Sequence, residues 1–332
     1  MIRLAALATG AGVPAGGFAG VVAHVFPRVC LLALSDQRLL TLATSPVGHL
    51  PGGITLDTSA EFLLCGRVAA GDEFAARGGI LRFAGGGLSV DLRGALRWRC
   101  DLAGLRLDID NPDVERAWRA ARAALRRDGR SGGLERAAAP AIRQLVSATR
   151  SFAAAAADVA IRALVGLGDG TTPAGDDFLV GYLAGLFCST TADEARTLFV
   201  LTLCRRIEAA AARTHRVSRA YLEAAAGGQV SERLYTLAVR VAAGADGAAL
   251  ALAVRTALAV GHCSGACGVL GLLIGCTVWP GAAGAKRAAL SPAPHGVDSV
   301  GSRPSARCEA CEPLAGGIKM SRVAATRFAN SA

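Results

Sequence analysis

The sequence predicts an α+β protein with a β-rich N-terminal domain at residues 1–110, a mainly α-helical domain at 111–280 and a disordered C-terminal tail at 281–332. Three observations support this division of the 332 residues. Short apolar runs separated by turn residues fill the first third of the chain. Alanine-rich helical segments follow from Asn111. After Pro280 the chain is small, polar and rich in proline, with little apolar surface to bury.

The β-rich domain is predicted from four short segments. The runs VCLLAL at 29–34, RLLTLAT at 38–44 and ILRF at 80–83 are bounded by turn residues, and GLSVDL at 87–92 alternates between apolar and other residues. Runs of this length between turn signals are typical of strands.

The helical domain begins with a capping pattern. Asn111 is a favourable N-cap, Pro112 suits the first helical position, and Gly129 suits the end of the helix. The alanine-rich composition favours further helices. We expect them at 134–164, 174–188, 194–212, 219–226, 230–242 and 246–260, with a last one after Ser264.

Charge and cysteine content argue against two classes of protein. The net charge is +10, but the arginines are scattered and no aromatic residues are interleaved with them, so we expect no nucleic-acid binding. The ten cysteines are dispersed, many within apolar runs, and indicate free thiols in a reducing cytosol rather than a disulfide scaffold. Cys308 and Cys311 have metal-like spacing, but a zinc site needs a second pair of ligands, which the sequence lacks.

The apolar segments are short. The longest run, at 266–279, is shorter than the roughly 20 residues that span a membrane. The N-terminal stretch MIRLAALATGAG is a poor match to a signal peptide, because glycines interrupt its apolar part. We therefore expect a soluble, cytoplasmic protein with no membrane partner.

The stretch GLGDGTTPAGDD at 166–177 carries the most distinctive chemistry. It does not fit a dinucleotide-binding loop, because the third glycine is misplaced and the preceding segment looks helical. It does not fit a P-loop either. Gly170 and Gly175 have the required separation, but Asp176 and Asp177 replace the lysine and the hydroxyl residue that bind a triphosphate.

A third interpretation is a helix start that receives an anion. Thr172 and Pro173 form a predicted N-cap and first turn, and the glycines let a ligand approach free backbone amides. Asp176 and Asp177 could hold a divalent cation, accept hydrogen bonds from a substrate amide, or act as a base. The competing interpretation is structural, since the helix dipole favours acids in a first turn and glycines permit close helix packing. Composition alone does not separate the two.

A second turn, AVGHCSGACG at 259–268, also places glycines and a candidate cap, Ser264, before an apolar helix. His262 lies just before this helix and is either a core or capping histidine or a functional one. A nucleophile formed by His262 with Cys263 or Cys267 is a further alternative.

Between the two turns lies the segment ARTHRVSRAYLEAAAGG at 212–228. Arg213 could bind a carboxylate or a phosphate. Alternatively, it is a surface arginine beside an ordinary N-cap formed by Ser218.

Three stretches together resemble the AllH-type subunit family of oxamate carbamoyltransferase: GLGDGTTPAGDDFLVGYLAGL, RTHRVSRAYLEAAAGG and GHCSGACGVLGLL. The resemblance extends over roughly residues 26–279 and is best in the helical part. It implies carbamoyl transfer in purine (allantoin) catabolism, interconverting carbamoyl phosphate and oxamate with oxalurate and phosphate. It also implies other protein subunits.

The residues that match the family motifs form the candidate site. The candidate catalytic residues are Asp176, Asp177 and His262. The candidate substrate-binding residues are Gly168, Gly170, Thr172, Gly175, Arg213, Thr214, Ser218, Ser264 and Gly265, with Pro173 also in the first motif. The chain departs from the family pattern at Thr171, Ala174, Ala266 and Cys267, so it lacks an acidic residue after Gly265 that could bind a metal.

We therefore expect one pocket where the helix starts at Thr172 and Ser264 converge, with Arg213 at its rim. It would take a small anionic amide or carbamoyl substrate, with helix amides and Arg213 stabilising the oxyanion and phosphate while Asp177 or His262 deprotonates the amine. Mg²⁺ is a candidate cofactor, and no other is assigned. The alternative is a non-catalytic accessory or scaffold subunit whose glycine-rich turns only pack helices against a partner.

Overall fold

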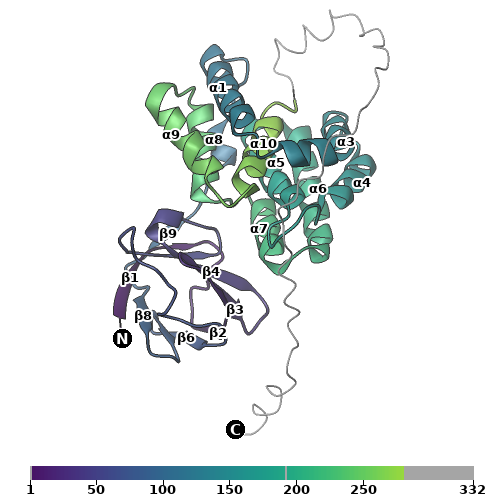
Figure 1. Cartoon of the computed structure of the whole chain (residues 1–332). Helices are drawn as coiled ribbons and strands as arrows, with labels where there is room; N and C mark the ends of the chain where they lie inside the picture. Colours follow the sequence, from purple (N-terminus) through teal and green to yellow (C-terminus); the bar gives the residue numbers. More distant parts are fainter. Residues whose placement is uncertain (1, 191–192, 280–332) are drawn as a thin grey trace, which may run out of the picture. The chain divides into compact units, whose positions relative to one another are not determined.

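The computed structural model describes residues 2–190 and 193–279, which form a β region followed by a helical region (Figure 1). This order of elements confirms the predicted α+β class. The predicted tail at 281–332 and the Cys308–Cys311 pair lie outside the described residues. Within the described ranges, no helix is long and apolar enough to cross a membrane.

The strands of the described chain form one sheet that closes into a barrel. Their order is β5-β4-β3-β2-β6-β7-β8-β1-β9, and antiparallel pairing of β1 with β5 closes the ring. Closure turns apolar side chains such as Leu32, Leu42, Ile54 and Leu88 into a common core. The strands are β1 (Ile2–Gly10), β2 (Phe18–Val25), β3 (Val29–Leu34), β4 (Leu39–Thr44), β5 (Gly53–Leu56), β6 (Glu73–Arg77), β7 (Ile80–Phe83), β8 (Leu88–Asp91) and β9 (Leu96–Trp98).

Sequence patterns find only part of this sheet. The strands predicted at 29–34, 38–44, 80–83 and 87–92 correspond to β3, β4, β7 and β8. The first strand, β1, is not predicted, because its sequence IRLAALATG is rich in alanine and leucine and has only two β-branched residues and no aromatic one. Pairing with β5, β8 and β9 holds it in the sheet instead.

The helical region agrees with the prediction in most of its bounds. The 3-10 turns η1 (Ser45–Val47), η2 (Ala103–Leu105) and η3 (Ala211–Arg213) accompany its helices and the barrel loops. The helices are α1 (Pro112–Asp128), α2 (Gly132–Ala137), α3 (Ala139–Arg150), α4 (Ala154–Leu164), α5 (Ala174–Ser189), α6 (Glu194–Ala210), α7 (Arg216–Ala226), α8 (Glu232–Ala242), α9 (Gly247–Leu258) and α10 (Ser264–Gly275).

The single helix predicted at 134–164 is wrong, because the structure divides it into α2, α3 and α4. Pro140 lies in the first turn of α3, where its missing amide is tolerated. The second break is at Phe152, which has a left-handed backbone with φ of 54°. Its ring packs against Phe199 and Trp279, with centroids 5.5 and 6.3 Å away, and these contacts stabilise the break.

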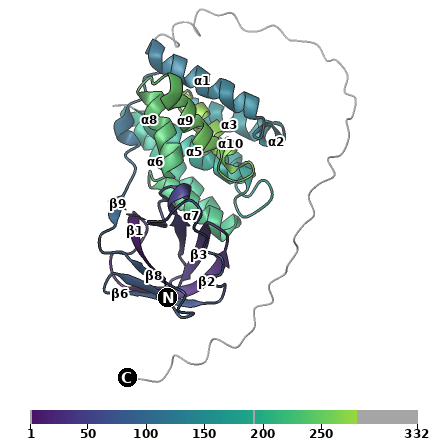
Figure 2. The same ribbon diagram turned by 60° about the vertical axis from the view of Figure 1, so that its left-hand side comes forward.

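Helices α5 and α10 lie side by side at the centre of the helical region (Figures 1 and 2). Their glycines allow this close approach. A Cβ atom on Gly271 would lie 2.0 Å from the Phe178 carbonyl oxygen, and one on Gly275 would lie 2.4 Å from that of Tyr182. Gly271 contacts Phe178, and Gly275, one turn later, contacts Tyr182, one turn later in α5. The two helices therefore run parallel and begin at the same end. This packing positions the candidate site.

Candidate functional site

The two predicted turns meet at the start of α5 and α10. The hydroxyl oxygens of Thr172 and Ser264 are 2.9 Å apart and share a hydrogen bond. The sequence predicts both residues as N-caps, but neither caps its helix in the structure. The N-cap position is Pro173 for α5 and Cys263 for α10, and neither makes a side-chain capping bond. The hydroxyls are therefore available to each other and to a neighbouring cavity.

A cavity of 230 Å³ adjoins this meeting point. Leu50 and Pro51 of the barrel form one wall. The polar part of the lining comes from the helical region and comprises Thr172, Asp177, Tyr221, Gln229, Ser231, Arg233 and Ser264. A volume of this size suits a small metabolite rather than a large cofactor.

Asp177 is the acidic group of the cavity. Its Oδ2 atom is buried and has no hydrogen-bond partner among the described residues. Burial raises the pKa of Asp177 to about 7, a hydrogen bond from Ser264 opposes this rise, and the charge of Asp176 adds to it. A carboxyl group of this kind can accept or donate a proton near neutral pH.

Asp176 faces away from the cavity and is fully engaged. Its Oδ1 atom accepts a hydrogen bond from the Gly166 amide at 2.8 Å, and its Oδ2 atom accepts from the hydroxyls of Thr214 and, at 2.7 Å, Ser218. Ser218 lies within the first turn of α7, whose N-cap position is His215, so Ser218 is not the N-cap. These contacts tie the loop before α5 to the start of α7, which is a positioning role.

The four candidate glycines have two different roles. Gly175 and Gly265 allow helix packing, since a Cβ atom would lie 2.1 Å from the Leu164 carbonyl oxygen in the first case and 2.3 Å from that of Ala257 in the second. Gly168 and Gly170 instead have positive φ, 112° and 89°, in the exposed loop before α5. In the described part of the chain, the backbone amides of residues 168–172 donate to no backbone carbonyl, so these N–H groups are available to bind an anion.

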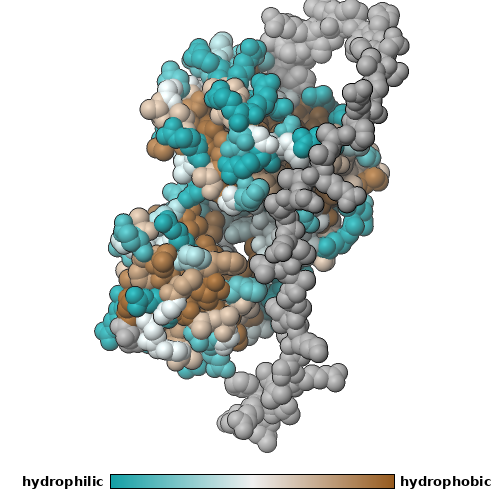
Figure 3. All heavy atoms as spheres, viewed as in Figure 1, coloured by the Kyte–Doolittle hydropathy of each residue, from teal (hydrophilic) through white to brown (hydrophobic). Residues whose placement is uncertain are grey.

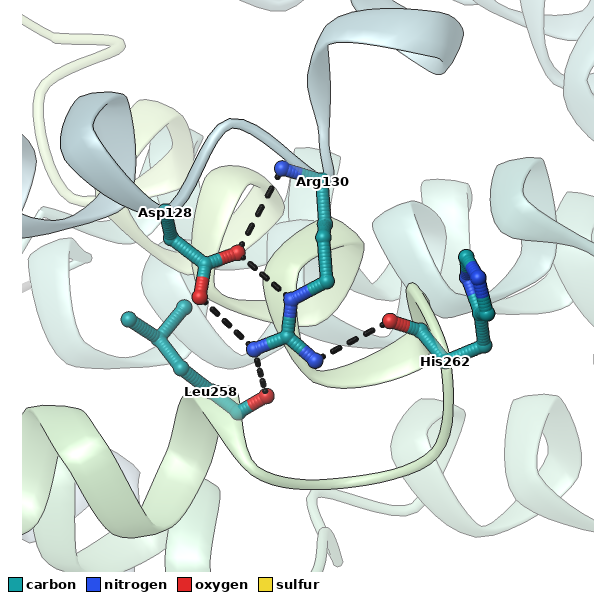
Figure 4. A network of polar contacts seen from close by, with 4 residues as sticks. All are labelled: Asp128, Arg130, Leu258 and His262. Carbon is teal, nitrogen blue, oxygen red and sulfur yellow. Dashed lines mark hydrogen bonds and ion pairs between the residues drawn. The ribbon is translucent and has the colours of Figure 1, made fainter. Parts of the chain in front are cut away.

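His262 and Arg213 do not line this cavity. The His262 side chain is exposed, and Figure 4 shows its ring directed away from Arg130 while its carbonyl oxygen faces that residue. Arg213 is also exposed, and its Nη1 atom donates to the Arg162 carbonyl oxygen at 3.2 Å. The nearby Cys267 thiol is buried, which raises its pKa strongly and keeps it uncharged, so it is a poor nucleophile.

Arg130 holds the turn that leads into α10 (Figure 4). Its guanidinium forms two hydrogen bonds of 2.8 and 2.7 Å with Asp128. The same group donates to the carbonyl oxygens of Leu258 at 2.8 Å and His262 at 3.0 Å. The segment that follows α1 thus holds the turn that precedes Ser264.

Arg233 and Tyr221 are two further cavity residues that are not predicted from the sequence. Arg233 makes no ion pair with a described residue, and its guanidinium donates to the carbonyl oxygens of Pro46 and, at 3.4 Å, Thr256. Burial lowers the pKa of Arg233, because removal from water disfavours the charged form of the guanidinium. Burial raises the pKa of Tyr221, so its phenol stays protonated. On the amphipathic helices α7 and α8 both residues look like ordinary partly exposed positions.

Within residues 2–190 and 193–279, no group of three or more His, Cys, Asp or Glu side chains is arranged to hold a metal ion. A magnesium role for Asp176 and Asp177 therefore gains no support from further protein ligands nearby. The carboxylate of Asp176 is already occupied by three donors.

Comparisons with known proteins give two matches. The family model of the oxamate carbamoyltransferase subunit AllH matches residues 164–276, and that of the AllH family N-terminal domain matches residues 5–97. Together they cover more than half of the chain, and both matched segments contribute walls to the cavity. No curated protein and no solved structure matches the chain.

Proposed function

The chain belongs to the AllH family of oxamate carbamoyltransferase subunits, and from this premise we propose that the Asp177 cavity binds oxamate and is the place where oxamate is carbamoylated. The observation that carries the proposal is the buried Asp177 Oδ2 atom, which lacks a partner among the described residues and lines the same cavity as Arg233. A base and a cation together match a ligand that has an amide at one end and a carboxylate at the other.

Arg233 is the group that would hold the substrate carboxylate. Its guanidinium has no carboxylate partner in the described chain, and a bidentate pair with an anion would compensate its partly buried charge. The amide nitrogen would then donate to Asp177. The Thr172 hydroxyl, which shares a hydrogen bond with Ser264, would turn to donate to the carbonyl oxygen.

Transfer would proceed with Asp177 as the base. The amide nitrogen of oxamate forms a bond to the carbamoyl carbon, and the bond from that carbon to the phosphate oxygen breaks. The nitrogen loses one proton to Asp177, which passes it to the departing phosphate and returns to its initial state. A pKa of about 7 suits both proton transfers. The products are oxalurate and phosphate.

Other subunits would complete the enzyme, as the family description of a subunit suggests. The β region exposes large apolar side chains, including Leu63 and Leu96, and Figure 3 shows apolar surface on one of its faces. Surfaces of this kind are used for protein contacts. The second candidate function, a non-catalytic scaffold, is favoured by the same surface and by the glycine packing of α5 and α10.

Calorimetric titration with oxamate tests the site. Arg233→Ala is expected to weaken oxamate binding at least about tenfold, because the carboxylate loses its partner. Asp177→Asn is expected to leave binding within about threefold but to abolish phosphate release by the assembled enzyme. Asp169→Asn, which changes an exposed acid of the adjacent loop, is the matched control and should alter neither quantity. Full activity of Asp177→Asn would exclude its role as the base, and failure of the unchanged protein to bind oxamate would favour the scaffold function.

A further inference from the structure

Helix α6 carries large apolar side chains on two faces. Its buried face, which includes Phe199, Leu203 and Ile207, packs against α4, α5 and α7. Its outer face also holds leucines, since Leu198 is 56% and Leu201 is 43% exposed. A surface helix typically keeps its apolar residues in one stripe that faces the core. The outer face of α6 therefore offers apolar surface that the described chain leaves partly uncovered.

The residues of this outer face follow the spacing of a coiled coil. Glu194, Leu198, Leu201 and Arg205 are all exposed, and they succeed one another by four, three and four positions. Alternating steps of three and four keep residues on one side of a helix, where they can contact the same side of a second helix. We call these four residues the α6 seam.

The two ends of the α6 seam carry opposite charges. Neither Glu194 nor Arg205 forms an ion pair or a side-chain hydrogen bond with a described residue, and both are exposed. The next arginine differs, because Arg206 pairs with Asp158 of α4 at 3.5 Å. The α6 seam thus has a free carboxylate at one end, a free guanidinium at the other and two leucines between them.

The α6 seam is complementary to itself when a second copy lies antiparallel to it. Glu194 precedes Leu198 by four positions, and Arg205 follows Leu201 by four positions. About a two-fold axis between the leucines, each Leu198 faces Leu201 of the partner subunit, and each Glu194 faces Arg205 of the partner subunit. A parallel arrangement would instead place like charges opposite each other, which is unfavourable.

We propose that α6 forms a homodimer interface in which the α6 seams of two copies of this chain pack antiparallel. The leucines supply the apolar contact. The charged ends fix direction and register, because exposed ion pairs contribute more to specificity than to affinity. Val159, which follows Asp158 in α4, is 58% exposed and adds apolar surface beside α6. This interface does not depend on the proposed function.

Sedimentation velocity of the full chain tests this interface, in a reducing buffer that prevents disulfide bonds between copies. One helix pair buries less area than a standard interface, so we expect a dimer at about 100 μM that dissociates toward about 1 μM. Leu198→Glu should weaken the dimer at least about tenfold, because it places a charge in the apolar contact. Leu252→Glu changes a 59% exposed leucine of α9 and is the matched control, which should leave the dissociation constant within about twofold.

Reversal of the charges tests the antiparallel register. Glu194→Arg alone and Arg205→Glu alone should each weaken the dimer at least about threefold, because like charges then meet at both ends of the α6 seam. An equimolar mixture of these two variants should associate as well as the unchanged protein. One chain then has two positive ends and the other has two negative ends. Association in the mixture also shows that both variants are folded.

Three results would overturn the proposal: a monomer of the unchanged protein at about 100 μM, equal effects of Leu198→Glu and Leu252→Glu, or no association in the mixture of the two charge variants. The first two results would assign the outer face of α6 to another occupant, such as a different subunit. The third would exclude the antiparallel pairing.

Discussion

Asp176 and Asp177 are adjacent in the sequence but have different surroundings. Three donors satisfy Asp176, so its charge is used to hold the loop before α5 against α7. Asp177 is one helical position further on and faces the cavity, where its Oδ2 atom has no partner among the described residues. Because a helix turns by about 100° per residue, neighbouring residues point in different directions. We infer that Asp176 builds the site and that Asp177 acts in it.

Asp177→Asn is expected to raise the free energy of unfolding at about pH 8 but not at about pH 4. Burial raises the pKa of Asp177 to about 7, above the ordinary aspartate value of about 3.9. Between these values the unfolded chain has released the proton and the folded chain has not, so stability falls as the pH rises from about 4 to about 7. Three pKa units correspond to about 4 kcal/mol, which partial solvent contact reduces to roughly 2 kcal/mol. Urea denaturation at both pH values measures the difference.

Asp128 provides a control of opposite sign. Hydrogen bonds from Arg130 lower the pKa of Asp128, so its ionised form stabilises the fold above the ordinary aspartate pKa, and this contribution is lost as the pH falls through the lowered value. Asp128→Asn should therefore destabilise the protein at about pH 8, with a smaller effect in acid. A loss of stability for Asp177→Asn at about pH 8 would contradict the inference that the ionised, buried Asp177 side chain destabilises the folded protein.

At the scale of elements, the glycines of α5 and α10 determine where the site forms. Gly271→Ala is expected to cost about 2–3 kcal/mol, because its Cβ atom would lie 2.0 Å from the Phe178 carbonyl oxygen and 2.7 Å from the Tyr182 amide nitrogen. The helices must then separate, which also moves Thr172 away from Ser264 and should weaken oxamate binding. Thermal denaturation and the oxamate titration measure the two effects.

The matched control is Gly133→Ala in α2, where no neighbouring atom lies within 4 Å of the added Cβ. Replacing glycine by alanine within a helix stabilises it by up to about 1 kcal/mol when there is room. A similar small gain for Gly271→Ala would show that the two helices are not held at glycine contact distance.

The sequence predicts these elements better than their contacts. The starts of α5 and α10 follow from Pro173, Ser264 and the apolar runs after them, because these signals are local, although neither helix start has the side-chain cap that the sequence predicts. The role of Arg233 depends on a barrel loop almost two hundred positions earlier in the chain, and no local pattern reports that contact. The break at Phe152 is missed for the same reason, since packing against Phe199 and Trp279 stabilises it. Tertiary contacts override helix propensity at that position.

At the scale of the whole molecule, the cavity requires both the barrel and the helical region. The loop that supplies Leu50 and Pro51 is bound to the start of α8. The His49 amide donates to the Glu232 carboxylate at 2.9 Å, and the Glu232 amide donates to the His49 carbonyl oxygen at 2.9 Å. Arg233, the next residue, donates to the carbonyl oxygen of Pro46. These contacts couple the closing wall of the cavity to the residue that would bind the substrate carboxylate.

Glu232→Ala is therefore expected to affect both stability and binding. Loss of the carboxylate leaves the partly buried His49 amide without its acceptor, which costs about 1–2 kcal/mol. The released loop should weaken oxamate binding by roughly threefold to tenfold, a loss of about 1 kcal/mol. Scanning calorimetry would show the barrel and the helical region unfolding less cooperatively.

Glu115→Ala in the first turn of α1, whose carboxylate pairs with exposed Arg119, is the matched control and should change stability by less than about 0.5 kcal/mol. Equal effects of the two substitutions on stability and on oxamate binding would mean that the contacts between Glu232 and the barrel loop do not support the site.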